Sequence, residues 1–247
     1  MINRFFPPLL ILTAFIAVWQ FYAQFGNISN TVLPAPSDIA QALIANWQLL
    51  AMHGAQTVSE ALVGLFFATI LGVGVAMLLF SFPRVRAGVN PLLVLSQTIP
   101  IIALAPLFLI WFGFEMLPKV LIVILYCFFP ITIATFDALR AADEDLVDLL
   151  KSMRASSWQI LRYVRLPSAL PSFFSGLKIA TTYSIAGAIV GEFVGAYQGL
   201  GIFMLTSANS HAIVLVFAAL VVTVLITVAL LAGVSVAERL LTPWKRV

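Results

Sequence analysis

The residues that could do chemistry are few, and the most unusual are two carboxylates in apolar stretches long enough to cross a membrane. Glu60 lies early in the stretch 56–80, and Glu192 lies late in the stretch 171–195. An ionisable side chain at such a position is costly to bury and is a functional candidate by default. We interpret Glu60 as a residue of the membrane interface. For Glu192 two alternatives stay open: an interfacial carboxylate, or a residue that lines a substrate path or gate.

Three uncharged side chains are further candidates for a substrate path. Gln97 and Thr98 directly precede Ile99-Pro100, and they could bond a substrate or a neighbouring carbonyl group. Tyr183 lies one helical turn before Gly187 and could stack on a flat substrate. The small residues around Tyr183 are typical of close helix packing in lipid.

No arrangement of residues indicates catalysis. His53 and His211 are far apart in sequence and lack metal-ligand spacing, and Cys127 is the only cysteine. We interpret Cys127 as a small buried hydrophobe. The sequence has no G-x-x-x-x-G-K-[ST] phosphate-binding motif. We therefore expect neither catalysis nor a metal or cofactor in this chain.

The composition is that of an integral membrane protein. Hydrophobic residues make up 62% of the 247 residues, and only 9% are charged, whereas soluble domains carry about 25%. The formal net charge of +3 is spread among apolar segments, so it does not indicate nucleic-acid binding. We expect one transmembrane domain over residues 1–247.

Segment lengths predict an all-α protein with six transmembrane helices, because a span needs about 20 apolar residues. The first is read as a retained span rather than a cleaved signal peptide. Pro100 and Pro106 interrupt the third span and Pro130 the fourth, which indicates packed, kinked helices. The six spans are Pro8–Phe25, Gln56–Phe80, Gly88–Phe112, Lys119–Ala138, Pro171–Gly195 and Ala212–Glu238.

Basic residues predict the orientation. Of the 13 Lys and Arg, 12 fall in the two terminal tails or the loops after spans two and four. Only Lys119 falls on the other side, so both termini are expected to be cytoplasmic, as in an inner-membrane protein. The 12 are Arg4, Arg84, Arg86, Arg140, Lys151, Arg154, Arg162, Arg165, Lys178, Arg239, Lys245 and Arg246.

Two segments outside the spans are expected to form short helices on the external side. An amphipathic helix over 39–50 follows a proline-rich stretch, and Ser37 or Asp38 could cap it. A glycine-rich turn over 196–201 precedes a half-helix that runs to about Ser210.

The fourth loop, Asp137–Ala180, is charged in a protein that otherwise has few charges. Its periodicity predicts two amphipathic helices, and Asp137 marks the end of span four. Pro167 is expected to break the chain and Pro171 to begin the fifth span. Either the apolar stripes rest on the bilayer, or the loop docks a cytoplasmic partner. The two stripes are Leu146, Leu149, Leu150 and Met153, and then Trp158, Ile160, Leu161 and Val164.

The segment Asp148–Ser156, nine residues and then Leu166-Pro167 together resemble the signature loop of ABC importer permeases of the binding-protein-dependent type. The family pattern is about E-A-A-x-x-x-G-A-S, nine residues and then a hydrophobic residue followed by L-P. The L-P-x-P-S segment after span one and the Gly-Glu-Phe-x-Gly segment of span five are also similar, so the resemblance covers nearly the whole chain. Here Asp replaces the family Glu, Leu149 and Leu150 replace two alanines, and Arg154 replaces a glycine.

The resemblance implies that the loop 143–167 (within about 139–170) is a coupling helix that enters a cleft on a separate ATPase subunit. It also implies a permease dimer, homomeric or heteromeric, and an external binding protein, periplasmic or lipid-anchored. The substrate would be a pyrimidine thiamine precursor or a small molecule of the nitrate, sulfonate or taurine type. The residues expected to contact the ATPase are Asp148, Met153, Arg154, Ala155, Ser156 and Trp158.

Arg154 leaves the geometry of the loop open. If the turn needs a positive φ, arginine costs about 1 kcal/mol there. Otherwise the turn has ordinary dihedral angles. The alternative function is a single-chain secondary transporter or channel, which needs no docking loop. An intramembrane enzyme would need paired acids or a nucleophile and base at membrane depth, and neither is evident.

Overall fold

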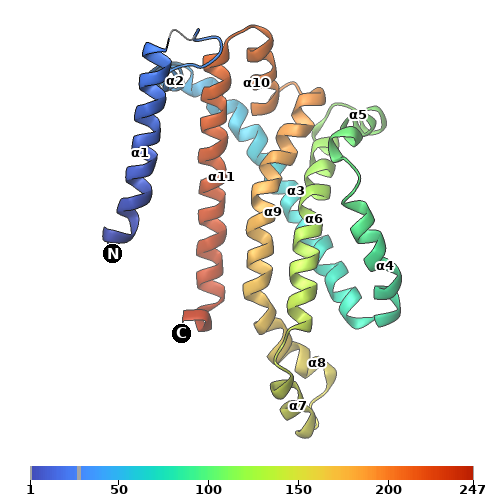
Figure 1. Cartoon of the computed structure of the whole chain (residues 1–247). Helices are drawn as coiled ribbons and strands as arrows, with labels where there is room; N and C mark the ends of the chain where they lie inside the picture. Colours follow the sequence, from blue (N-terminus) through green and yellow to red (C-terminus); the bar gives the residue numbers. More distant parts are fainter. Residues whose placement is uncertain (1, 27–28, 247) are drawn as a thin grey trace.

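The computed structural model describes residues 2–26 and 29–246, and within these ranges the chain is helical without a β-strand (Figure 1). Among the described residues, four helices are long and apolar enough to cross a membrane: α3, α6, the continuous helical segment Ser157–Gly195, and α11. The α-helices are α1 (Ile2–Phe25), α2 (Pro36–Ala45), α3 (Trp47–Ser81), α4 (Pro83–Ser96), α5 (Ile101–Phe112), α6 (Met116–Arg140), α7 (Glu144–Ser152), α8 (Ser157–Ile160), α9 (Leu166–Gly195), α10 (Leu200–Asn209) and α11 (Ile213–Leu241).

The core of the protein is formed by α3, α6 and α9, and α6 packs most extensively against the other two. Two glycines bring the helix backbones together. A Cβ at Gly64 of α3 would lie 2.4 Å from the Val123 side chain of α6. A Cβ at Gly176 of α9 would lie 2.5 Å from the Cβ of Ala134 on α6. Small residues therefore set the close approach that packing in lipid requires.

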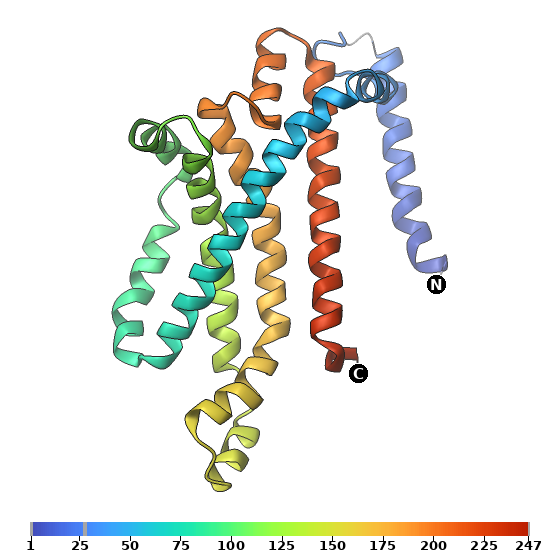
Figure 2. The same cartoon turned by 180° about the vertical axis from the view of Figure 1, so that it is seen from behind.

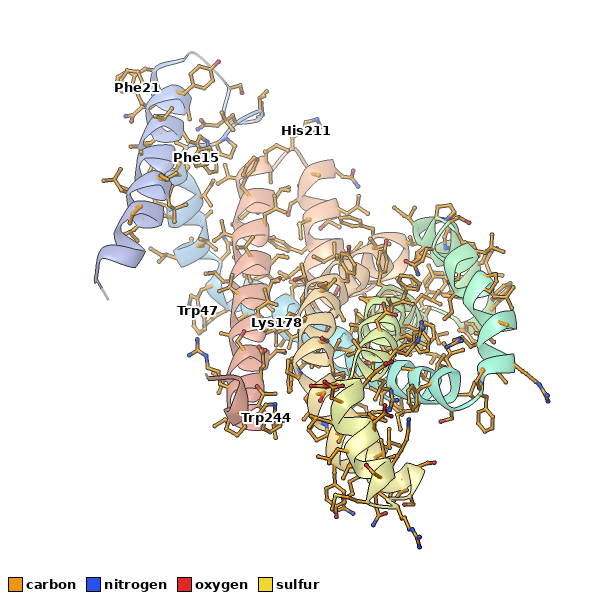
Figure 3. All side chains as sticks on the ribbon, turned by 60° about the horizontal axis from the view of Figure 1, so that its bottom comes forward. Phe15, Phe21, Trp47, Lys178, His211 and Trp244 are labelled. Atoms are coloured by element: carbon orange, nitrogen blue, oxygen red, sulfur yellow. The ribbon has the colours of Figure 1, made fainter. Side chains whose placement is uncertain are left out.

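The periphery is apolar and exposed, as expected of a lipid-facing surface. Phe15 and Phe21 of α1 are 63% and 66% exposed, and α1 stands apart from the core (Figure 3). Helix α1 contacts the rest of the protein through α2 and through Trp19, whose ring centroid lies 5.9 Å from that of Phe217 on α11. Such a surface would aggregate in water and is suited to the bilayer.

The third expected span is not a continuous helix. Helix α4 ends at Ser96, α5 begins at Ile101, and residues 97–100 between them are not helical. Pro100 has no backbone N–H to continue the helix and disfavours helical geometry in the residue before it. Pro106 and Pro130 stay inside α5 and α6.

Several predicted boundaries were wrong, and Pro171, which was expected to begin the fifth span, lies inside α9. Pro167 does not break the chain, because a π-helical turn over Leu161–Arg165 joins α8 directly to α9. The wider turn accommodates the lost backbone hydrogen bond of the proline. The external helix begins at Pro36 with Ala35 as its N-cap, and neither Ser37 nor Asp38 caps it. Proline at the first helical position is preorganised for this start. This helix ends at Ala45, so 47–50 belong to α3.

Most of the Lys and Arg side chains lie at one end of the bundle. The α3–α4 junction, the α7–α8 pair and the C-terminus lie at this end, and α7 and α8 project furthest (Figures 1 and 2). Lys119 lies in the first turn of α6, at the opposite end. Arg4, Lys245 and Arg246 lie outside the residues whose side chains the structure describes.

Candidate functional site

The turn between α7 and α8 is closed by two consecutive capping motifs. Helix α7 begins with the Asp143 carboxylate, which accepts a hydrogen bond from the Asp145 N–H at 2.9 Å. At its end the N–H of Ala155 donates to the Leu150 carbonyl at 2.9 Å, and the N–H of Arg154 donates to the Lys151 carbonyl at 2.8 Å. This pair of bonds is the Schellman motif, which places its C′ residue in the left-handed region.

Arg154 is that residue, with a φ of 61°. The loop therefore adopts the positive φ that suits glycine and carries the strain of an arginine. Ser156 follows as the N-cap of α8 and forms a capping box with Gln159: the Gln159 N–H donates to Ser156 Oγ, and the Ser156 N–H donates to Gln159 Oε1 at 2.7 Å. The interlocking caps fix the angle between α7 and α8.

The loop has its own small core. Ala142, Val147, Ile160 and Val164 are buried together, and Leu150 and Ala155 pack partly against them. Large apolar side chains remain on the outside, and they include most of the first predicted stripe. The exposed set is Leu146, Leu149, Met153, Trp158 and Tyr163.

The predicted stripes therefore differ from the observed faces. The loop turns Val147 inward and Leu146, Leu149 and Met153 outward, because the loop's core packs α7 against α8 and the π-helical turn rather than against lipid. Met153 is 70% exposed and Trp158 63% exposed, and both lie on the part of the molecule that projects beyond the bundle (Figure 1). The described part of the chain leaves this apolar face largely uncovered.

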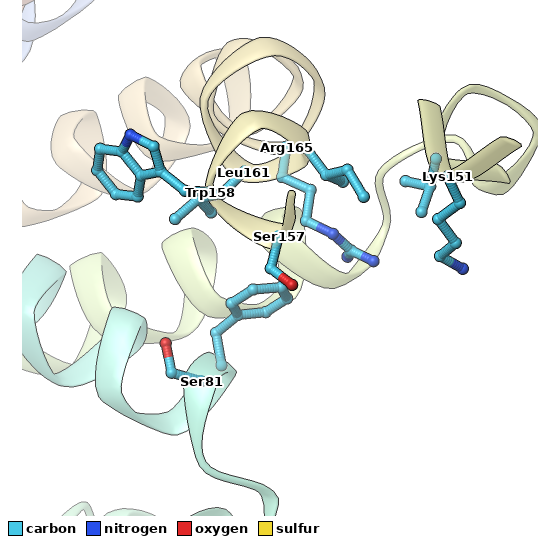
Figure 4. Close-up of a pocket in the computed structure, with 9 residues that line it drawn as sticks. Ser81, Lys151, Ser157, Trp158, Leu161 and Arg165 are labelled. Carbon is cyan, nitrogen blue, oxygen red and sulfur yellow. The ribbon is translucent and has the colours of Figure 1, made fainter. Parts of the chain in front are cut away.

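Arg165 joins the loop to the transmembrane helices. Its guanidinium donates to the Leu139 carbonyl near the end of α6 at 2.8 Å and lies 4.9 Å from the ring centroid of Phe80 on α3. A pocket of about 480 Å³ lies beside it, between the loop and the end of α3 (Figure 4). The lining residues are Phe80, Ser81, Val147, Lys151, Ser157, Trp158, Ile160, Leu161 and Arg165.

Asp148, the expected counterpart of the family glutamate, forms an exposed ion pair with Lys151 one turn later, with Nζ 2.8 Å from Oδ1. Exposed pairs at this spacing contribute little to stability. Asp148 is therefore free to interact with a partner without loss of the loop's own structure.

Glu192 lies at the other end of the protein and is fully buried. Its carboxylate accepts hydrogen bonds from Thr57 Oγ1 of α3, at 2.7 Å, and from the N–H of Gly201 in the first turn of α10. Negative charge is stabilised at a helix N-terminus. A Cβ at Gly199, where φ is 132°, would lie 2.2 Å from the carboxyl carbon. The glycine-rich turn thus wraps the carboxylate closely.

Thr57 and a second residue of α3, His53, also bond the glycine-rich turn. Thr57 Oγ1 also accepts from the Leu200 N–H at 2.9 Å, and His53 Nδ1 accepts from the Gly199 N–H at 3.0 Å. The carboxylate, the hydroxyl and the imidazole together bond the first turn of α10. Sequence reasoning missed Thr57, because a threonine in an apolar run gives no signal of its long-range partner.

Glu60 is also fully buried, inside the packed helices rather than on the protein surface. Oε1 accepts from Gln56 at 2.9 Å, and the buried Lys119 supplies an opposite charge nearby. The small residues Ala61 and Gly64 permit this burial by bringing α6 close. Lys119 Nζ itself donates to the carbonyl groups of Phe114 and Glu115.

The uncharged candidates converge at the break between α4 and α5. Gln97 and Thr98 lie in the non-helical residues 97–100 and are exposed. Tyr183 of α9 faces Tyr126 of α6, with ring centroids 6.4 Å apart. Gln97 and Tyr183 line one pocket, but Thr98 is not among its lining residues. Tyr126 was not predicted as a site residue, because an aromatic residue in an apolar span is typical of helix packing.

Lys178, in the middle of α9, forms an ion pair and hydrogen bond with Glu238, which lies near the end of α11. Both side chains are largely shielded, so the pair ties α11 to the core. Within the described part of the chain no group of three or more His, Cys, Asp and Glu side chains is arranged to hold a metal ion.

Comparison with known proteins finds matches that cover most of the chain. Residues 64–247 match the family described as binding-protein-dependent transport system inner membrane component. A probable ABC transporter permease protein of Haemophilus influenzae is 39% identical over 92% of this chain and 93% of its own length. The formylaminopyrimidine transport permease protein ThiX of Halalkalibacterium halodurans is 35% identical over 97% of this chain and 96% of its own length.

The fold also matches a solved structure. A chain in an inward-facing conformation of the MetNI methionine ABC transporter superposes with a TM-score of 0.69 at 21% identity. The match covers 79% of this chain and 97% of that chain, and it supports the helical arrangement described above.

Proposed function

Because this chain belongs to the family of binding-protein-dependent transport system inner membrane components, we propose that it is one half of a dimeric importer permease driven by a separate ATPase subunit. It is a multi-pass inner-membrane protein and the permease component of an ABC transporter, without a catalytic role of its own. The ATPase subunit docks on the loop 143–167.

The observation that carries this proposal is the exposed apolar face on a rigid, projecting loop. Leu149, Met153 and Trp158 are each more than half exposed, although the loop has its own buried core. Large apolar anchors surrounded by polar groups are typical of protein-binding hot spots. The methionine side chain adapts well to a groove on a partner.

The contacts of the loop would pass its movement on to the core helices. The capping motifs hold α7 and α8 as one unit, and the π-helical turn continues directly into α9. Arg165 links the same unit to α6 and α3. Movement of the loop with an ATPase would therefore tilt the core helices, which is the motion that alternating access requires.

A second copy of the chain would complete the substrate pathway. Residues 97–100 are exposed in the single chain, and non-helical backbone at membrane depth is tolerated only against protein or in a water-filled cavity. A homodimer with its substrate pathway between the two copies would supply both the protein surface and the water-filled cavity. The single domain 1–247 then crosses the membrane six times, as α1, α3, α4 with α5, α6, α9 and α11, with both termini in the cytoplasm.

The substrate is delivered by an external binding protein. We favour a flat pyrimidine of the thiamine-precursor type over a nitrate, sulfonate or taurine-type molecule. The support is the 35% identical formylaminopyrimidine permease, and the aromatic character of the residues around the α4–α5 break.

The test places a charge on the docking face. Met153→Asp is the informative change, because Met153 is exposed; Ala155 is half-buried against the loop's core, so a charge there would damage the loop itself. We expect Met153→Asp to abolish co-purification of the ATPase and uptake while membrane insertion persists. The matched control is Ser168→Asp, an exposed position just outside the loop. Retention of both properties in Met153→Asp would refute the docking role, and a single-chain transporter would then be favoured.

A further inference from the structure

A pocket of about 310 Å³ lies beside the break between α4 and α5. Its walls come from three separate elements: the broken segment and the start of α5, the middle of α6, and α9. The lining residues are Gln97, Ile99, Ile101, Leu125, Tyr126 and Tyr183. A second pocket of about 240 Å³ shares Gln97, Ile99, Ile101 and Leu125, so the hollow continues along the break.

The backbone at this point is not helical, so its N–H and C=O groups lack the regular hydrogen bonds of a helix. Residues 97–100 are non-helical and exposed, although they lie between the two halves of an apolar span. Such a segment must face water or protein rather than lipid. Broken helices at membrane depth mark substrate sites in transporters for this reason.

The chemistry of the lining is uncharged and aromatic. The two tyrosine rings lie 6.4 Å apart at an interplanar angle of 57°, and Tyr183 is 46% exposed. Gln97 offers both a donor and an acceptor. The lining contains no Lys, Arg or His, so it offers no positive group to bind a sulfonate or nitrate. The volume is at the lower limit of small-molecule pockets, which fits a single-ring ligand.

We propose that Gln97, Tyr126 and Tyr183 form a subsite that holds an uncharged, flat, single-ring nitrogen heterocycle during its passage through the permease. The heterocycle stacks on the exposed ring of Tyr183, with Tyr126 against its edge. Gln97 bonds a ring nitrogen or an exocyclic amino group. This inference rests on the proposed function, because the subsite matters only in a working permease.

The test uses the permease reconstituted with its ATPase subunit in lipid nanodiscs, with 4-aminopyrimidine as the probe and taurine as the comparison ligand. Binding is measured by ligand-observed NMR titration. We expect Tyr183→Ala to weaken 4-aminopyrimidine binding about 5- to 150-fold, the range of base–aromatic stacking. Tyr183→Phe keeps the ring and should stay within about twofold. Tyr197→Ala, at an 81% exposed tyrosine outside the pocket, should change nothing.

Two outcomes would overturn the subsite. One is an absence of 4-aminopyrimidine binding to the unaltered complex, or binding no stronger than that of taurine. The other is equal binding by Tyr183→Ala and the unaltered complex. Assembly with the ATPase is read on the same samples. Failure of the unaltered chain to assemble would refute the proposed function and the subsite with it, whereas assembly without selective binding refutes the subsite alone.

Discussion

Thr57→Val tests the buried polar cluster that joins α3, α9 and α10. The change keeps the shape of the side chain and removes a hydroxyl that makes two long-range hydrogen bonds. Thr57 Oγ1 donates to Glu192 at 2.7 Å and accepts from the Leu200 N–H at 2.9 Å. Valine would leave a carboxylate oxygen and a backbone N–H buried without these partners.

The magnitude follows from the two groups that lose a partner. Each buried group left unsatisfied costs about 1–3 kcal/mol, so Thr57→Val should lower the free energy of unfolding by about 2–6 kcal/mol. For a chain of this size each kcal/mol lowers the Tm by about 2–4 °C. A loss of at least about 4 °C is therefore expected.

Thr69→Val is the matched control, because Thr69 lies on the same helix and its hydroxyl donates to the Leu65 carbonyl one turn earlier, at 2.7 Å. That carbonyl belongs to the helix's own ladder, so the loss should stay below about 1 kcal/mol. The assay is thermal unfolding of both purified variants in the same detergent. Equal shifts for Thr57→Val and Thr69→Val would refute the structural role of the cluster.

Three further results are expected. Arg154→Gly should leave the loop as stable as before or stabilise it by up to about 1 kcal/mol, because glycine adopts a positive φ without strain, whereas Arg154→Val should destabilise the loop. Hydrogen exchange of the backbone amides over 143–160 measures both effects. Faster exchange in the glycine variant would contradict the positive φ at this position. Gly176→Ala should lower the free energy of unfolding by about 1–3 kcal/mol through overpacking, whereas Gly74→Ala, with open space around it, should not lower the Tm. An unchanged Tm in Gly176→Ala would refute the close contact between α9 and α6. Lys178→Ala should loosen α11 and lower the Tm by several degrees, because it removes the ion pair that joins α9 to α11; an unchanged Tm would show that the pair contributes nothing.

The long helices were predictable because lipid imposes a simple length rule. α6 contains the fourth expected span, α11 contains the sixth except for its first residue, and the half-helix expected to end near Ser210 is confirmed as α10. The two helices of the loop were also predictable from charge and periodicity. Their inward faces were not, because a stripe of apolar residues does not show whether a helix packs on lipid, on a neighbour or on a partner.

The prolines show a second limit of the sequence. Pro100 ends a helix in the membrane, yet Pro167 lies in the first turn of α9 directly after a π-helical turn. The difference depends on the turn before each proline, which no local rule specifies. The geometry at Arg154 was similarly open: an arginine suits ordinary dihedral angles, and only the backbone shows the positive φ of 61°.

The buried carboxylates show a third limit. Glu192 and Glu60 were visible as candidates from burial cost alone. Their surroundings depend on residues distant in sequence, since Thr57 lies 135 residues before Glu192. The pairing of Gln97 with Tyr183 likewise comes from the packing of α9 against α6 beside the helix break.

The most direct test of the ATPase-docking role is a cross-link from Met153→Cys. The native thiol, Cys127, is fully buried and should not react, so the new thiol at a 70% exposed position is the reactive one. With a short thiol–amine cross-linker in native membranes, we predict a product that contains the permease and its ATPase subunit. Gln198→Cys, exposed on the opposite end, should give none. A Met153→Cys thiol that reacts with a soluble maleimide but yields no such product would contradict the docking role.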